Sequence, residues 1–423
     1  MPIIGIDDTD SSREMCTTYL TVEILKRTSL DLIGFPKLVR LNPNIPIKTR
    51  GNGAISMLLG RGYGSKRIVG MVDDEPVYSY EKYSPEKIDI DIMSVIEKFS
   101  PREKNTNPAL IVSDEKPNPQ YYWDAVREFV DFKSVLGRIS GKISTINGNV
   151  GIVGANAAMS WPAETITYEL IAYLEPTRWN GEHYVDDESA IYLERNYSDM
   201  FDSYDFENRY NAIRPSTKTP VLFGLRGTDP ELLAKHRINV KSEPYRSYII
   251  YMTNQGTDDH LVKRKISDSK IYQSSIIEGY LNDNPVHLRG GIVEFPVEDK
   301  SGIIVAVAME PTKQFRSVIS SLRKGDLVKV YGGITRPGYI NVEKIQVKKI
   351  STVKIVLPPV CRKCGKKMES IGKNAGFRCR KCGSKSRYGI ESFEERSISE
   401  GFYEVPIIAR RHLARPLKLG VIK

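Results

Sequence analysis

Two Cys-x-x-Cys pairs near the C-terminal end restrict the fold of this chain more than any other feature. Fourteen residues separate the first pair, Cys361 and Cys364, from the second pair, Cys379 and Cys382. Four thiolates at this spacing can complete a tetrahedral zinc site, and a small module without a core of its own needs such a link. Because four cysteines leave no open coordination position, the sequence predicts a structural zinc and not a catalytic one.

Positive charge is concentrated in the same part of the chain. Residues 351–423 hold seventeen Lys and Arg against six Asp and Glu, whereas residues 1–350 hold 45 against 46. Each cysteine pair encloses an Arg-Lys dipeptide, so the expected ribbon presents basic side chains. This distribution predicts a polyanion-binding end joined to a nearly neutral body.

Short β-type runs fill residues 281–350 and precede the ribbon. They alternate with glycines and turn residues, which is typical of a five-stranded barrel of the OB type. A β-barrel of another kind is the alternative. Strands that alternate with helices in the earlier part of the chain make α+β multidomain the expected fold class. A barrel beside a basic ribbon favours a nucleic-acid-binding platform.

Three aspartates follow the first apolar run of the chain, which reads as a buried strand. They are Asp7, Asp8 and Asp10, and two threonines, Thr17 and Thr18, come shortly after them. Magnesium prefers oxygen ligands, and phosphoryl transfer needs a metal that bridges phosphate oxygens. We therefore expect a magnesium and phosphate site here. The alternative is an Asp-rich turn that caps the following helix.

A second polar loop combines glycines with basic side chains. It contains Lys48, Arg50, Gly51, Asn52 and Gly53. Glycines let phosphate oxygens approach backbone N–H groups, while Lys and Arg supply charge. The loop is not a Walker motif, and a plain β-turn is the alternative reading.

Residues 151–210 are strongly acidic, with twelve acids and three bases. Such a stretch forms either a solvated face or a pocket for a cationic small molecule. Within it, Asp202, Asp205 and Glu207 alternate with aromatic residues and could face a guanidinium or ammonium group. We expect these three acids to line a pocket beside the aspartate loop, with Asp205 as the first choice for the cation-binding residue and Asp202 as the second.

Membrane and secreted proteins are the classes that the sequence disfavours. No stretch approaches the ~18 uninterrupted apolar residues of a membrane helix, and the N-terminus lacks a basic region followed by a long apolar one. Five cysteines among 423 residues do not make a disulfide framework, which favours a reducing compartment. The expected location is the cytoplasm.

Seven segments spread over the chain resemble one known family. They are residues 5–11 (GIDDTDS), 15–20 (MCTTYL), 40–46 (RLNPNIP), 48–54 (KTRGNGA), 167–173 (TYELIAY), 253–260 (TNQGTDDH) and 401–406 (GFYEVP). In this order, and together with the barrel and the cysteine pairs, they resemble the archaeal synthetases that form 2-agmatinylcytidine in isoleucine tRNA. No single segment is a general motif, but the set is specific.

The resemblance implies an ATP-dependent ligase that replaces the C2 oxygen of the anticodon wobble cytidine with agmatine, through a phosphorylated base. Its ligands would be ATP with Mg²⁺, agmatine and isoleucine tRNA, beside the structural zinc. The implied domains are a kinase-like catalytic domain over residues 1–200, with an insertion near 90–130 that could belong to the next domain, a ferredoxin-like domain over 201–280, an OB-fold over 281–350, and a zinc ribbon with a basic tail over 351–423.

The resemblance also assigns roles to single residues. A threonine of the Cys-Thr-Thr segment becomes phosphorylated in the family, and of Thr17 and Thr18 we favour Thr17. Two positions depart from the expected pattern, because Glu14 stands in place of a glycine and Leu174 in place of an arginine. The residues expected to bind tRNA are Arg362, Lys363, Arg380, Lys381, Arg410 and Arg411.

Two other functions fit part of this pattern. A non-catalytic protein that binds tRNA or single strands needs the barrel and the ribbon but not the aspartate loop, so magnesium-dependent ATP turnover would exclude it. A kinase that stops at the phosphorylated product would leave the same base mass with and without agmatine.

Overall fold

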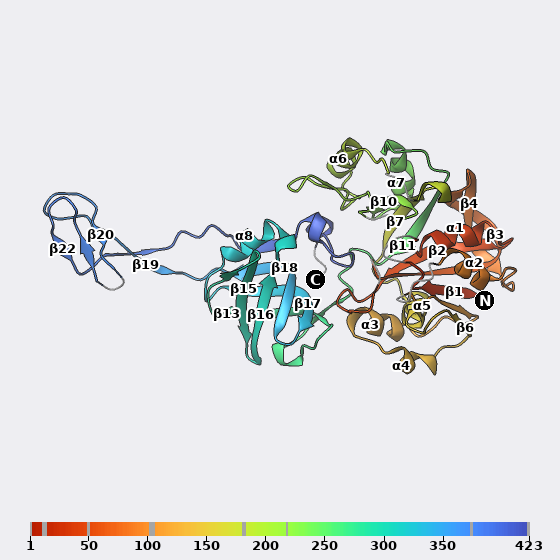
Figure 1. Ribbon diagram of the computed structural model, residues 1–423, viewed down its shortest axis with the longest axis horizontal. Coiled ribbons are helices and arrows are strands. Elements are labelled where there is room, and N and C mark those ends of the chain that lie inside the picture. The colour runs from red at the N-terminus through yellow and green to blue at the C-terminus, as the bar shows by residue number, and fades with distance from the viewer. Residues whose placement is uncertain are drawn as a thin grey trace.

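The computed structural model describes residues 2–10, 15–48, 51–100, 106–179, 183–216, 219–372 and 375–420. The molecule is elongated, with a mixed α/β body at one end, a β-barrel in the middle and a small ribbon at the other end (Figure 1). Within these residues, no helix is long and apolar enough to span a membrane.

A nine-stranded sheet forms the centre of the body in the described part of the chain. Its strands are β1 (Ile3–Asp7), β2 (Asp31–Arg40), β3 (Gly53–Val72), β4 (Glu75–Ser84), β5 (Ala109–Ser113), β6 (Lys142–Thr145), β7 (Thr167–Tyr173), β10 (Val221–Gly227) and β11 (Ser247–Thr253). Their order in space is β10-β7-β11-β2-β4-β3-β1-β5-β6. A small hairpin of β8 (Tyr204–Asp205) and β9 (Tyr210–Asn211) stands apart from this sheet.

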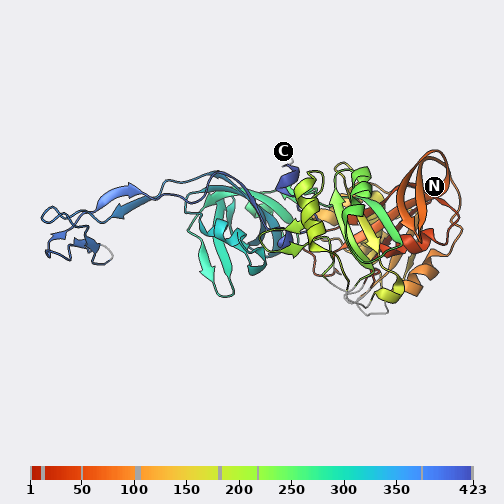
Figure 2. The same cartoon turned by 90° about the horizontal axis from the view of Figure 1, so that it is seen from above.

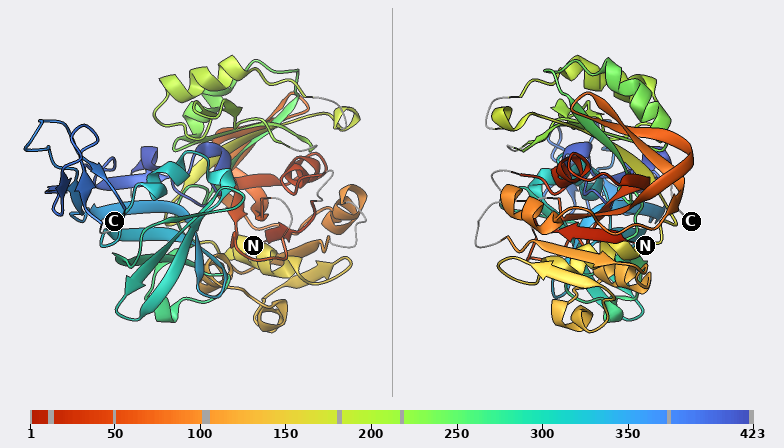
Figure 3. Two further views of the ribbon diagram at one scale, coloured as in Figure 1. Left: turned by 60° about the vertical axis from the view of Figure 1, so that its left-hand side comes forward. Right: turned by 90° about the vertical axis from the view of Figure 1, so that its right-hand side faces the viewer.

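Helices in the described part of the chain pack around the body sheet. They are α1 (Tyr19–Leu25), α2 (Ile92–Phe99), α3 (Gln120–Arg127), α4 (Phe132–Leu136), α5 (Gly151–Ser160), α6 (Asp187–Asn196) and α7 (Pro230–His236). Helices α6 and α7 lie near the β10 end, and α3, α4 and α5 lie near the β5 and β6 end (Figures 1 and 3).

Strand β1 is buried on both faces, which fixes the position of the aspartates that follow it. Ile4 and Ile6 have no exposed surface. Helix α5 lies directly on β1 because Gly5 has no side chain, since a Cβ there would overlap the carbonyl oxygen of Ala155. This close approach brings the N-terminal half of α5 beside the C-terminal end of β1.

The next sheet closes into a five-stranded barrel, as the sequence predicted. Its ring consists of β13 (Ser274–Leu281), β15 (Ile292–Asp299), β16 (Gly302–Ala308), β17 (Leu327–Arg336) and β18 (Tyr339–Lys349). The ring runs β13-β17-β18-β16-β15 and back to β13, and all of its pairs are antiparallel except β16–β18. Helix α8 (Phe315–Ser320) connects β16 to β17. The strands β12 (Leu261–Lys263), β14 (Val286–Leu288) and β24 (Gly401–Glu404) extend this sheet.

Beyond the barrel, a two-stranded stalk leads to the ribbon. The stalk pairs β19 (Lys354–Leu357) with β23 (Ile390–Phe393), and the ribbon holds β20 (Glu369–Ser370), β21 (Phe377–Arg378) and β22 (Lys385–Ser386). After the stalk the chain returns, because β24 pairs with β18. Residues 405–420 then run back to the body (Figure 2). We call residues 405–420 the returning segment.

The domain borders near residues 200, 280 and 350 stay a prediction. Strands β10 and β11 lie beyond residue 200 but share one sheet with β1 to β7. The barrel takes its first ring strand from residues 274–281. What the structure gives directly is the coarser description, a mixed α/β protein of several parts with a five-stranded barrel and a C-terminal ribbon.

Candidate functional site

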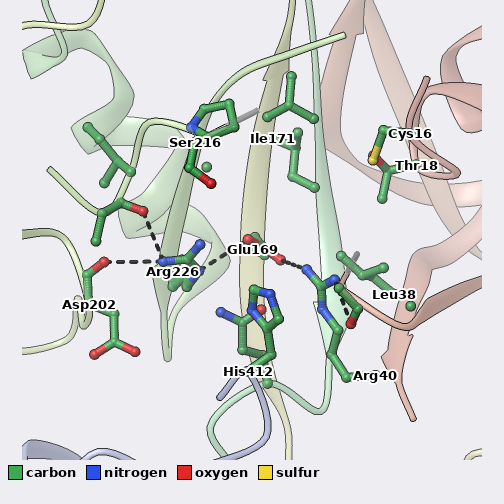
Figure 4. Close-up of a pocket in the computed structure, with 18 of the residues that line it drawn as sticks. Cys16, Thr18, Leu38, Arg40, Glu169, Ile171, Asp202, Ser216, Arg226 and His412 are labelled. Atoms are coloured by element: carbon green, nitrogen blue, oxygen red, sulfur yellow. Dashed lines mark hydrogen bonds and ion pairs between the residues drawn. The ribbon is translucent and has the colours of Figure 1, made fainter. Parts of the chain in front are cut away.

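A pocket of about 420 Å³ lies where the body meets the returning segment (Figure 4). It brings together side chains that are far apart in the sequence. Those with charged, hydroxyl, thiol or imidazole groups are Asp10, Cys16, Thr17, Thr18, Arg40, Glu169, Asp202, Tyr210, Arg214, Ser216, Thr219, Arg226, Arg410, Arg411 and His412. We call this space the central pocket.

The aspartate loop stands at one side of the central pocket. Burial, followed by the charge of Asp8, raises the pKa of Asp7 well above its usual value. Burial also raises the pKa of Asp8, although Asp8 accepts hydrogen bonds from the backbone N–H of Asn107 at 2.9 Å and from its side chain at 3.3 Å. Asp10 lines the pocket itself. Two neighbouring buried carboxylates with raised pKa values are stabilised in their charged form by a cation.

The oxygens of this loop fit magnesium as a partner of phosphate groups. Among the described residues, the three aspartates do not converge on one point as the four cysteines do. Magnesium is usually held by one or two carboxylates together with phosphate oxygens and water. Asp7 and Asp8 would hold it in that way. Gly154 allows α5 to approach, because a Cβ there would overlap Oδ2 of Asp7.

The two predicted threonines lie in the pocket wall just before α1, and both are buried. The hydroxyl of Thr9 donates to that of Thr17 at 3.1 Å. The hydroxyl of Thr18 lies 3.1 Å from the thiol of Cys16. The backbone carbonyl of Thr18 accepts a hydrogen bond from Tyr251 at 2.8 Å, so the position of this turn is fixed by the sheet.

The glycine-rich loop lies beside the aspartate loop, because Ile6 of β1 pairs with Ile55 of β3. Gly51 and Gly53 line the central pocket, whereas Arg50 lies outside the described residues. Asn52 donates from its side chain to the carbonyl of Asn42 at 2.8 Å and does not line the pocket. Lys48 donates to the carbonyl of Pro43. Burial, followed by the charge of Arg411, lowers the pKa of Lys48 to about 8.

A buried ion triad forms the floor of the central pocket, and no local sequence pattern indicated it. Glu169 accepts from Arg40 at 3.2 Å and from Arg226 at 3.2 Å (Figure 4). Gly51 makes room for Arg40, because a Cβ at Gly51 would overlap its guanidinium. Residues 40 and 169 are 129 positions apart, so a local pattern could not pair them.

His412 of the returning segment lies beside this triad (Figure 4). The charge of Arg40, followed by burial and by the charge of Arg226, holds the pKa of His412 well below its usual value. The imidazole is therefore neutral at neutral pH. It gives the pocket a side chain that can accept or donate a hydrogen bond without adding charge.

The structure separates the three acids that were expected to bind a cation. Asp202 lies in the central pocket. Asp205 and Glu207 instead line a neighbouring groove of about 620 Å³, between the β8 turn, α8 and the returning segment. Asp205 accepts from the side chain of Asn208 at 3.0 Å and from the backbone of Ile408 at 3.2 Å. We call this space the side groove.

The six residues expected to bind tRNA also fall into two places. Arg362, Lys363, Arg380 and Lys381 are exposed on the ribbon. Arg410 and Arg411 lie in the central pocket instead. Arg411 forms an ion pair with Glu343 at 3.3 Å, and Arg410 pairs with Asp202 and Glu404.

The four cysteines meet as predicted. All four Sγ atoms lie within 4.8 Å of one another. Gly365 and Gly383 follow the two pairs with φ of 68° and 73°, and each donates its N–H to the carbonyl of the first cysteine of its pair at 2.9 Å. The geometry and the thiolate chemistry fit a structural zinc ion.

The fold and the site define a mixed α/β protein whose polar pocket is joined to a five-stranded barrel and a basic four-cysteine ribbon. Family models described as the TiaS TCKD domain, the TiaS FLD domain and the TiaS C-terminal zinc ribbon domain match residues 3–145, 149–260 and 358–398. The chain belongs to the TiaS family, the 2-agmatinylcytidine synthetases that act on isoleucine tRNA.

Relatives cover nearly the whole chain. The TiaS protein of Archaeoglobus fulgidus is 39% identical to this chain, and the match covers 98% of this chain and 96% of the relative. The TiaS protein of Thermoplasma volcanium is 40% identical, and the match covers 98% of this chain and 97% of the relative. A solved complex of TiaS with isoleucine tRNA and ATP superposes with a TM-score of 0.83 at 35% identity, over 100% of this chain and 98% of that one. A complex of TiaS with isoleucine tRNA, AMPCPP and agmatine superposes with a TM-score of 0.80 at 34% identity. This match covers 98% of this chain and 96% of that one.

Proposed function

We propose that this chain is an ATP-dependent ligase that joins agmatine to C2 of the wobble cytidine in isoleucine tRNA. One observation carries the proposal. The chain is similar over its full length to TiaS proteins, whose solved complexes contain isoleucine tRNA, ATP and agmatine. It also has a pocket lined by carboxylates, guanidiniums and hydroxyls.

The proposed chemistry has two steps. A pyrimidine C2 oxygen is a poor leaving group, so the γ-phosphoryl group of ATP is first transferred to it. The primary amine of agmatine then attacks C2, the C2–O bond breaks, phosphate leaves and the nitrogen gives up a proton. The wobble nucleotide must be flipped out of its stack for either step.

The aspartate loop and the glycine-rich loop would serve the first step. Asp7 and Asp8, with Asp10 beside them in the pocket, would hold a magnesium ion, which would supply Lewis-acid chemistry and neutralise phosphate charge when bound. Lys48 with residues 50–53 would hold the remaining phosphate charge. These roles fit the kinase-like domain that the family resemblance implies for the first part of the chain, followed by a ferredoxin-like domain.

The threonine segment would carry the phosphate of a phosphoprotein form. Thr17 and Thr18 both line the pocket, and we retain Thr17 as the phosphorylated residue. Agmatine would bind through its guanidinium to an acid of the region around Asp202, which shares this pocket.

The ribbon and the barrel would hold the tRNA outside the pocket. Arg362, Lys363, Arg380 and Lys381 are exposed and therefore available to phosphate groups. Arg410 and Arg411 would meet the flipped nucleotide and not the tRNA body, because they lie in the pocket. A cytoplasmic location suits both the tRNA substrate and the reduced thiols of the zinc site.

The test is mass analysis of the wobble nucleoside after isoleucine tRNA has been incubated with the chain, ATP and agmatine. The proposal expects agmatine to be added with loss of water, and no product without ATP. Tight tRNA binding without ATP consumption would instead identify a binding protein. A phosphorylated base that never gains agmatine would identify a kinase.

A further inference from the structure

Strand β18 of the barrel contains a bulge where the barrel meets the body. The register of its pairing with β17 shifts by one residue between Val342 and Lys344, so Glu343 is the extra residue of the bulge. Such a residue bends its strand and redirects the side chains around it. Val342 and Ile345 both belong to the core of the barrel. The two residues between them, Glu343 and Lys344, are therefore both free to contact the body.

Lys344 joins the bulge to the body outside the central pocket. Its ammonium nitrogen lies 2.9 Å from a carboxylate oxygen of Asp258. It also donates to the backbone carbonyl of Arg415 in the returning segment at 2.8 Å. Lys344 does not line the central pocket, so these contacts hold the two parts of the protein together without reaching the site.

The carboxylate of Glu343 lies between a histidine of the body and an arginine of the returning segment. Its side chain is 7% exposed, and that of His260 has no exposed surface. Nε2 of His260 donates to Oε2 of Glu343 at 3.0 Å, since a carboxylate only accepts. Oε1 lies 3.3 Å from Nη1 of Arg411. Burial alone would raise the pKa of Glu343, but the charge of Arg411 and the contact with His260 hold it below its usual value. Glu343 is therefore charged at neutral pH.

The contacts that hold Arg411 are concentrated on one of its nitrogens. Nη1 donates to Oδ1 of Asn44 and also pairs with Glu343. Asn44 donates to the hydroxyl of Ser274 in β13 at 2.8 Å, and Gly333 of β17 makes room for it, because a Cβ there would overlap its amide oxygen. Arg411 lines the central pocket. Within the described residues its Nε and Nη2 make no hydrogen bond or ion pair, so they can donate to a ligand there.

The barrel thus reaches the reaction site through one carboxylate. We propose that Glu343 is a positioning residue, which keeps the guanidinium of Arg411 in the wall of the central pocket where the flipped wobble nucleotide binds. Glu343 does not line this pocket itself, so it acts through Arg411. This proposal rests on the function proposed above, since it concerns the nucleotide that is modified. The planar guanidinium donates in fixed directions, and its orientation therefore decides whether it meets the nucleotide.

The test measures kcat for agmatine transfer and the Kd for isoleucine tRNA with the full-length chain. Arg411→Met should lower kcat by roughly tenfold or more, because a charge-assisted hydrogen bond to the nucleotide is lost. Glu343→Gln keeps the size of the side chain but not its charge, and should lower kcat by roughly tenfold through misplacement of Arg411. The double variant should be no slower than Arg411→Met alone, because the two residues act as one unit. The Kd for tRNA, which depends on the exposed basic side chains, should change by about twofold at most.

Lys344→Met is the matched control, because Lys344 is the other residue of the bulge and does not contact the guanidinium of Arg411. This variant weakens the junction between barrel and body by removing the ion pair with Asp258. Its kcat should stay well above that of Glu343→Gln, and its effect should multiply with that of Arg411→Met. A kcat as low as that of Glu343→Gln would assign the effect to the junction and overturn the proposal.

Two further results would also overturn it. One is a double variant of Glu343 and Arg411 in which the two losses multiply, and the other is an unchanged kcat in either single variant. Thermal unfolding of each variant identifies misfolding. If Glu343→Gln does not fold, Glu343→Asp replaces it, because it keeps the charge but withdraws the carboxylate from Arg411. Its loss of kcat should again disappear when Arg411 is already replaced by Met.

The outcome can be separated from a failure of the proposed function. If the unaltered chain transfers no agmatine to tRNA, the function itself is wrong. If it does transfer agmatine while the losses in the double variant multiply, only the positioning role of Glu343 is wrong.

Discussion

Gly154→Ala is expected to separate catalysis from stability. In a helix, alanine is favoured over glycine by roughly 1 kcal/mol, so propensity alone predicts a more stable chain. At this position, however, the new Cβ would overlap Oδ2 of Asp7 and lie 2.6 Å from its Cγ. Carbon atoms in contact are normally about 3.5–4.0 Å apart. The Asp7 carboxylate must therefore move.

The expected loss of activity follows from the displacement of the Asp7 carboxylate. A shift of a reacting group by about 1 Å can cost on the order of 100-fold in rate, while overpacking at one buried position costs about 1–3 kcal/mol. We expect ATP consumption in the presence of tRNA to fall by about 100-fold, with a net change in the free energy of unfolding within about 2 kcal/mol.

The assay is phosphate release under saturating ATP and tRNA, with urea unfolding measured in parallel. Gly137→Ala is the control, because nothing lies within 4 Å of a Cβ at that position. If Gly154→Ala folded normally and kept ATP consumption within about twofold of the unaltered chain, against the hundredfold loss expected from misplacement, the placement of Asp7 against α5 would not matter for the reaction.

Three further predictions follow from the site. Asp7→Asn should abolish ATP consumption but raise the Tm of the metal-free chain. The pKa of Asp7 is raised in the folded state, so the folded state binds the proton more tightly and gains stability as the pH falls through that pKa. A Tm that does not respond to the substitution or to pH would contradict this. Cys361→Ser should release zinc and weaken tRNA binding at moderate salt while ATP binding persists, as measured by metal analysis and filter binding; retained zinc with unchanged tRNA affinity would oppose it. Thr17→Ala should remove radioactive phosphate label from the protein after incubation with labelled ATP, and loss of label in Thr18→Ala alone would show that the choice between the two threonines is wrong.

The predictable parts of this protein are those that depend on local spacing. The two cysteine pairs indicate a ribbon because ligand spacing within each pair is fixed by the metal. The barrel is visible as short strands separated by turn residues. The aspartate loop is visible because β1 is apolar and ends in consecutive carboxylates.

The remaining parts depend on contacts that only the folded chain creates. Glu169 joins Arg40 and Arg226 from three strands of the sheet, and His412 reaches them from the returning segment. The division of the acidic stretch between two spaces also depends on the folded chain. Asp202 and Asp205 are neighbours in sequence, but the turn before β8 sends one into the central pocket and the other into the side groove.

The returning segment follows the ribbon in the chain, yet it completes the wall of the central pocket. During synthesis on a ribosome the N-terminal parts emerge and fold first. The body and the barrel are therefore finished before His412 has been translated, and a nascent or prematurely ended chain lacks that wall. A complete central pocket can arise only after the four-cysteine ribbon has been made, so the order of translation keeps incomplete copies from modifying tRNA.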